Sequence, residues 1–180
     1  SEAHETNPDS LVGDMVRAQQ AGDEISDHEI ASVVYSMLFA GHETTTTLIS
    51  NAMRVLLSHP DQWQQLVADP TKIGPAIDEV LRYSGSIVAG RRKALADATV
   101  GGVEIPKGAE LLLVMGSANR DGERFAAGEE LDISRENARD HLSFGFGIHY
   151  CLGNMLANLQ AKIALEEIVR LMPHVRLQDG

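Results

Sequence analysis

The residues best suited to chemistry gather around the chain's single cysteine, Cys151. Residues 144–153 read FGFGIHYCLG, and the apolar spacing that follows predicts a helix over residues 152–171. Unpaired amides and the dipole at a helix start stabilise a thiolate. Two glycines upstream permit tight turns around the sulfur, and Gly153 leaves room for a large flat group. Cys151 is therefore predicted to be a nucleophile or a metal ligand rather than an inert buried thiol.

Other kinds of cysteine and histidine site fit the sequence less well. A metal site made of side chains needs several ligands, and the chain has no second cysteine. A cysteine protease needs a base, and His149, two residues away on a turn, is expected to point elsewhere. His42 and Glu43 begin the zinc-protease pattern His-Glu-x-x-His, but residue 46 is a threonine, which excludes that pattern.

Two further segments carry groups that could serve such a site. Glu79 and Arg82 face each other at the i, i+3 spacing of a helix, as an ion pair that is either exposed or buried. Residues 40–44 read AGHET and begin a run of four threonines within a predicted helix. Threonine hydroxyls can bond the carbonyl four residues back, so Thr44 could open the helix at Ala40. The alternative is an ordinary β-branched stretch of core helix.

Together these segments resemble the cytochrome P-450 family. The family's haem loop, Phe-x-x-Gly-x-His/Arg-x-Cys-x-Gly, is matched at every defined position from Phe144 to Gly153. The resemblance implies haem b (iron protoporphyrin IX) as cofactor, with Cys151 as the axial thiolate and metal ligand. It also implies that His149 donates to a haem propionate. An axial thiolate pushes electron density onto the iron and favours O–O cleavage.

The same resemblance gives Glu79 and Arg82 a structural role, as a buried pair under the haem loop. The family usually adds a third member to this pair, an arginine. Alignment on the family's Asn-Arg-Asp segment puts Glu130 at that position. A different cation, Arg124 or Arg135, would then have to replace it.

The threonine-rich segment is similar to the family's oxygen-activating turn, in which an acid and an alcohol relay protons. Glu43 and Thr44 are the implied catalytic pair, and Met37 and Ala40 are implied to lie over the distal haem face. Arg92 falls at the family's propionate-binding arginine, although Arg91 or Lys93 takes its place if the register moves by one. The remaining implied cofactor contacts are Val88, which would face the substrate, and Phe144, Gly145, Gly153, Ser143 and Ala157. Ser143 and Ala157 could equally be packing residues.

The periodicity predicts a mainly α chain with a small antiparallel β region. Helices are predicted over residues 11–20, from a capping box at Ser26–Glu29 to Ser58, and over residues 61–68, 73–83 and 152–171. Strands are predicted over residues 88–93, 98–100, 103–105 and 110–115, the last of them buried because of its apolar run, and residues 116–150 are expected to be irregular.

The resemblance identifies this arrangement as the C-terminal half of the cytochrome P-450 fold, with a long buried distal helix and a cysteine loop. Residues 1–180 are then a single partial domain that lacks the N-terminal half and the final strands. In isolation the long helix is expected to expose a large apolar face.

The net charge of −11 argues against nucleic acid, and no apolar run reaches the length that spans a bilayer. A cytoplasmic protein is expected. The resemblance implies a monooxygenase that inserts one atom of O2 into a small apolar organic substrate. Its electrons would come from a ferredoxin or a flavin reductase, separate or fused. The alternatives are reductive chemistry at the same haem, and a non-catalytic haem-binding fragment or sensor.

Overall fold

The computed structural model describes residues 9–178, which are mostly helical. The chain divides into two compact units, Ser1–Glu43 and Thr44–Gly180. The helices are α2 (Leu11–Gln20), α3 (Asp27–Leu57), α4 (Pro60–Ala68), α5 (Ile73–Ser84), α6 (Met115–Ala118) and α7 (Asn154–Leu171), with short 3-10 turns at Pro70–Lys72, Ala138–Asp140 and Gly147–His149. The strands are β1 (Gly90–Lys93), β2 (Ala98–Val100), β3 (Val103–Ile105) and β4 (Glu110–Leu113).

The first unit contains α2 and the first half of α3. The predicted capping box is present, because the Ser26 amide donates to Glu29 Oε2 at 2.8 Å and the Glu29 amide donates to Ser26 Oγ at 3.2 Å. These bonds from Ser26 lower the pKa of the Glu29 carboxyl. Beyond the cap the helix exposes large apolar side chains, among them Tyr35, Leu38 and Phe39. This apolar exposure is what the sequence led us to expect for the long helix.

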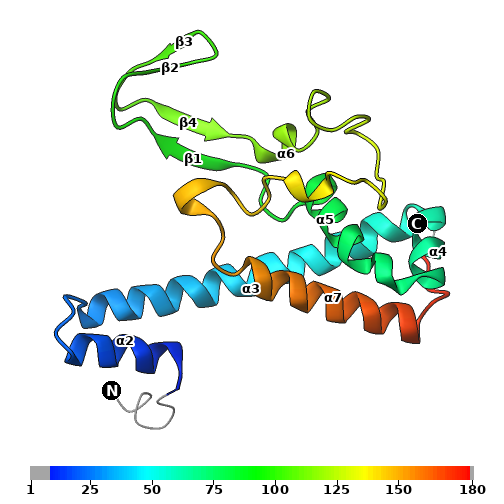
Figure 1. Ribbon diagram of the computed structural model, residues 1–180, viewed down its shortest axis with the longest axis horizontal. Coiled ribbons are helices and arrows are strands. Elements are labelled where there is room, and N and C mark those ends of the chain that lie inside the picture. The colour runs from blue at the N-terminus through cyan, green and yellow to red at the C-terminus, as the bar shows by residue number, and fades with distance from the viewer. Residues whose placement is uncertain (1–8, 179–180) are drawn as a thin grey trace. The chain divides into compact units, whose positions relative to one another are not determined.

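The second unit has its core where the end of α3 meets α4, α5 and α7 (Figure 1). Leu56, Leu66, Val80 and Leu165, one from each of these helices, are fully buried there. Trp63 donates from its indole nitrogen to the carbonyl of Pro173 at 3.0 Å, which holds the segment after α7 against α4. The core therefore gives α5 and α7, the helices nearest the predicted site, a fixed base.

The β region consists of two separate two-stranded antiparallel ladders. β2 and β3 form the predicted hairpin, in which Gly101 and Gly102 take φ values of 56° and 81°. β1 pairs with β4 (Figure 1), and in this register Arg92 lies opposite Leu111. Each of these ladders leaves much of its surface open.

Several predicted boundaries were wrong. β1 begins at Gly90 rather than at residue 88, and β4 ends at Leu113 rather than at residue 115. β4 is also not a buried strand, since Leu112 is 62% exposed, because within residues 9–178 this ladder has only two strands. The stretch 116–150 is not wholly irregular but contains α6 and two 3-10 turns.

Candidate functional site

The loop that carries Cys151 is closed by its own backbone. The Cys151 amide donates to the Phe144 carbonyl at 2.8 Å, and the Tyr150 amide donates to the Gly147 carbonyl at 3.0 Å. Gly145 and Gly147 have φ values of 77° and 66°, a left-handed conformation in which a side chain would be strained. These two glycines allow the chain to reverse direction and bring the cysteine back beside Phe144.

On its other side the cysteine leads into α7. The helix begins at Asn154, with Gly153 as N-cap, and not at Leu152 as predicted, because residues 151–153 form a turn. The Asn154 side chain donates to the Cys151 carbonyl at 2.8 Å, which fixes that turn. A Cβ atom at Gly153 would lie 4.0 Å from the Cys151 sulfur, so the glycine leaves the half-buried thiol uncovered on that side.

Large apolar side chains on either side of Cys151 in the sequence lie open to solvent. Phe146 is 85% exposed and Ile148 is 98% exposed within the loop, and Leu152 and Met155 are 84% and 80% exposed after it. Burial of such a cluster under a large apolar group is favourable. One sulfur ligand next to an apolar surface is the donor set that suits a haem, so the residues present fit this cofactor.

His149 and Arg92, the predicted partners of the haem propionates, both expose their side chains. His149 lies in the 3-10 turn of the cysteine loop, two residues before the cysteine. Arg92 lies in β1 and donates to the carbonyl of Arg91 at 2.8 Å. Their roles toward the propionates stay predictions.

Glu79 and Arg82 form an ion pair that is completely buried in α5. Arg82 donates to both carboxylate oxygens of Glu79 at 2.7 Å. Its other donors reach the carbonyls of Asn119, Gly128 and Glu130 at 2.7–2.8 Å. These five bonds account for all five N–H donors of the guanidinium.

The third member of this cluster is Arg135. It lies 3.2 Å from Glu79, and its guanidinium also donates to the carbonyl of Ala126. The alignment that gave Glu130 this place was wrong, because Glu130 contributes only its carbonyl and its side chain is exposed. Arg124, the other candidate, pairs with Asp140 instead.

Two residues that sequence reasoning missed hold the start of the cysteine loop. Asn119 is buried and donates from its side chain to Ser143 Oγ at 2.9 Å. The His141 ring accepts from the Ser143 amide at 3.1 Å and packs 5.5 Å from the Phe144 ring, which itself packs against the core. Ser143, predicted as a cofactor contact, uses its hydroxyl within the protein by donating to the Leu81 carbonyl.

The predicted catalytic pair, Glu43 and Thr44, is consecutive in α3 and falls at the boundary between the two units. Glu43 is exposed and Thr44 half-buried, and the Thr44 carbonyl accepts from Ser86 Oγ at 2.7 Å. Met37 and Ala40 lie on the exposed half of α3. The bond from the Thr44 hydroxyl to the Ala40 carbonyl stays a prediction.

The last two predicted contacts lie in the second unit. Val88 is 59% exposed and its side chain lies against Gly116, at which a Cβ atom would come within 2.8 Å of it. Ala157 is half-buried on α7.

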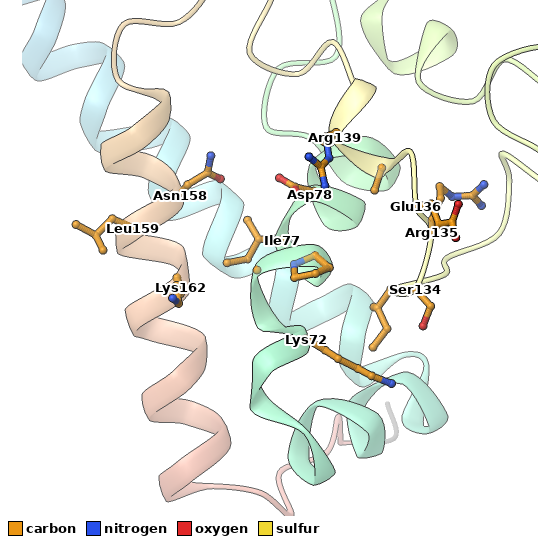
Figure 2. Close-up of a pocket in the computed structure, with 14 residues that line it drawn as sticks. Lys72, Ile77, Asp78, Ser134, Arg135, Glu136, Arg139, Asn158, Leu159 and Lys162 are labelled. Atoms are coloured by element: carbon orange, nitrogen blue, oxygen red, sulfur yellow. The ribbon is translucent and has the colours of Figure 1, made fainter.

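A hollow of about 770 Å³ lies between α5, α7 and residues 133–139 (Figure 2). Asp78 and Arg139 both line it and lie close together, and burial raises the pKa of Asp78 while the charge of Arg139 opposes that rise. Asn158 Oδ1 is buried beside the hollow and has no hydrogen-bond partner among residues 9–178. Neither Cys151 nor any predicted cofactor contact lines the hollow, so it is separate from the cysteine loop.

Comparison with known proteins gives the family. The cytochrome P-450 family model matches residues 2–72 and 74–172. The chain is 40% identical to cytochrome P-450 CYP107DY1 of Priestia megaterium, over 94% of this chain and 41% of that protein. The chain belongs to the cytochrome P-450 family, whose members bind haem through a cysteine thiolate.

Solved structures agree with this assignment. Cytochrome P-450 CREJ is 66% identical, with a TM-score of 0.95 over 99% of this chain and 45% of that chain. One CREJ structure is a complex with (4-ethylphenyl) dihydrogen phosphate. An intact type IV self-sufficient cytochrome P-450 monooxygenase is 42% identical, with a TM-score of 0.94 over 99% of this chain and 24% of that chain. The chain thus spans less than half the length of these relatives.

Over residues 9–178, no helix combines the length and the apolar character that a bilayer crossing requires.

Replacement of Arg82 by alanine should destabilise the fold strongly. The change leaves the Glu79 carboxylate buried beside only one cation and takes the Arg82 donor from the buried carbonyls of Asn119 and Gly128, which costs about 3–5 kcal/mol in free energy of unfolding. Arg124→Ala is the matched control, because its ion pair with Asp140 is largely exposed and is worth about 1 kcal/mol or less. Urea unfolding measures both, and equal losses would contradict the role given to Arg82.

Stability should also fall in mild acid because of His141. Burial lowers the pKa of His141 from 6.5 to about 4, so the folded protein binds fewer protons than the unfolded chain between these values. The free energy of unfolding is therefore expected to fall as the pH drops through this window and to level off below it. Urea unfolding at several pH values gives the slope of the free energy of unfolding against pH. This slope should be smaller in His141→Phe than in the unmodified protein, and equal slopes would refute the assignment.

Proposed function

We propose that this chain carries the haem-binding part of a monooxygenase that inserts one atom of O2 into an organic substrate. The observation that supports the proposal most is the cysteine loop, in which the thiol is half-buried and neighbouring residues of the sequence expose large apolar side chains. When bound, the haem supplies the iron at which O2 is reduced and split. The two electrons required come from a ferredoxin or a flavin reductase, separate or fused.

Each residue of the chain has a limited task in this proposal. Cys151 provides the thiolate ligand. The hydrogen bond from its backbone amide to the Phe144 carbonyl keeps the sulfur in place. His149 and Arg92 donate to the propionates, for which the two-pronged guanidinium of arginine is well suited. Met37 and Ala40 cover the distal face of the haem, and Val88 faces the substrate.

Glu43 and Thr44 move the protons. Glu43 is exposed, so its carboxyl can exchange protons with water, and the half-buried hydroxyl of Thr44 can pass a proton onward. Such a relay requires a titratable group that reaches bulk solvent and a hydroxyl nearer the reaction. These two consecutive residues have that difference in exposure.

Labelled oxygen provides the test of the reaction class. With an electron donor and isotopically labelled O2, the product should carry one labelled oxygen atom and none from water. The Cys151→Ala variant should give no labelled product. A product whose added oxygen comes from water would exclude a monooxygenase. Substrate consumption that continues without O2 but requires the electron donor would favour reductive chemistry instead.

Thr44→Ala should separate electron use from product formation. Without the hydroxyl, proton delivery becomes poorly timed, so product formed per electron pair is expected to fall on the order of tenfold or more, while haem content stays the same. Thr47→Ala is the matched control, because Thr47 is also half-buried and lies three residues further along α3. Unchanged product yield in Thr44→Ala would count against the relay.

We further propose that the substrate is a phenyl phosphate monoester. The support is CREJ, which is 67% identical over 99% of this chain in its complex with (4-ethylphenyl) dihydrogen phosphate. This substrate class keeps the small apolar part expected from the sequence, here as a phenyl ring, and adds an anionic group.

Affinity measurements on the haem-loaded protein test this substrate class. Binding of 4-ethylphenyl phosphate, followed by the change in haem absorption, should be at least about tenfold tighter than binding of 4-ethylphenol, because charged hydrogen bonds to the phosphate add affinity. Equal or tighter binding of the phenol would contradict the phosphate requirement.

A further inference from the structure

Hydrogen bonds through Asn119 join the buried cluster around Arg82 to Ser143. The next residue, Phe144, is hydrogen-bonded to the amide of Cys151. We infer that Asn119 and Ser143 are positioning residues, which hold the start of the cysteine loop and thereby fix the ligand sulfur. This inference rests on the proposed function only in that Cys151 is taken as the haem ligand. It assigns Ser143 to the support of the loop rather than to contact with the cofactor.

Asn119 connects the Arg82 cluster to the loop. Its carbonyl accepts from Arg82 at 2.8 Å, and its side-chain oxygen accepts from the Leu142 amide at 2.7 Å. Its side-chain nitrogen donates to Ser143 Oγ at 2.9 Å. Asn119 is 2% exposed, so water cannot replace these bonds at low cost if the side chain is lost.

Ser143 also binds the start of the cysteine loop, residues 142–143, to the end of α5. Its hydroxyl donates to the Leu81 carbonyl at 2.5 Å. Because α5 ends at Ser84, the Leu81 carbonyl is one of the last four of the helix and has no partner four residues ahead within it. The serine therefore satisfies a helix-end carbonyl and accepts from Asn119 with the same oxygen.

Gly85 provides the space for this junction. A Cβ atom at Gly85 would lie 2.5 Å from Ser143 Oγ and 2.8 Å from the Leu81 carbonyl oxygen. Gly85 itself has φ −61°, an ordinary value, so the requirement for glycine here is steric and not conformational. An alanine at this position would have to push Ser143 away from its acceptor.

The next residue, Phe144, connects this support to the cysteine, because its carbonyl accepts a hydrogen bond from the Cys151 amide at 2.8 Å. The far end of the loop offers little restraint of its own, because Phe146 and Ile148 are almost fully exposed. The bonds of Asn119 and Ser143 therefore support the sulfur from the N-terminal side of the loop, as Asn154 and α7 do from the C-terminal side.

Ser143→Ala and Gly85→Ala disturb the junction from its two sides. In each variant, hydrogen exchange of the peptide that contains Cys151 is expected to become faster by about fivefold or more, as the loss of one buried hydrogen bond predicts. In the haem-loaded protein, the reduced CO complex should lose its thiolate signature faster by a similar factor. Ser58→Ala, which removes a hydroxyl that donates to a carbonyl on α3, is the matched control and should change neither rate.

Leu165→Ala separates positioning from loss of overall stability, because it opens a cavity in the core and removes none of the hydrogen bonds of the junction. The two variants are compared at denaturant concentrations that give them the same free energy of unfolding. If Leu165→Ala then accelerates hydrogen exchange at Cys151 as much as Ser143→Ala does, the inference is wrong. Unchanged exchange in both junction variants would also overturn it. Absence of a thiolate signature in the unmodified protein would refute the proposed function instead, and hydrogen exchange would still decide the positioning role.

Discussion

The structure depends on a fully buried guanidinium, that of Arg82. A buried cation is tolerated only when it is paired and all its donors are satisfied, and here two carboxylate oxygens and three backbone carbonyls meet that requirement. The carbonyls come from residues 119–130, a stretch without regular secondary structure after α6. Arg82 therefore fixes this stretch against α5, and Arg135 completes the charge balance around Glu79.

The cysteine loop uses the order that this cluster creates. Its first residues are bonded to Asn119 and to the end of α5, whereas its tip is exposed and apolar. Such a division suits a loop that must hold one sulfur in place and offer an apolar surface to a large cofactor. Membership of the cytochrome P-450 family gives this loop its chemical meaning.

Local features of the fold could be predicted from the sequence, and distant ones could not. The capping box at Ser26 and the glycines of the β2–β3 hairpin act within a few residues, so their sequence pattern was sufficient. Arg135 reaches Glu79 across more than fifty residues of chain, and the alignment chose Glu130 because no local signal distinguishes the two. Asn119 was missed for the same reason. The prediction that β4 is buried was wrong, because apolar composition does not reveal how many strands a sheet has.

The claim on which the account depends is that Cys151 is a thiolate ligand of haem, and the absorption spectrum of the reduced protein with CO tests it most directly. The account predicts the red-shifted Soret band of a thiolate-ligated ferrous haem, and loss of that band in Cys151→Ala. Retention of the band in the variant, or its absence from the haem-loaded unmodified protein, would contradict the account.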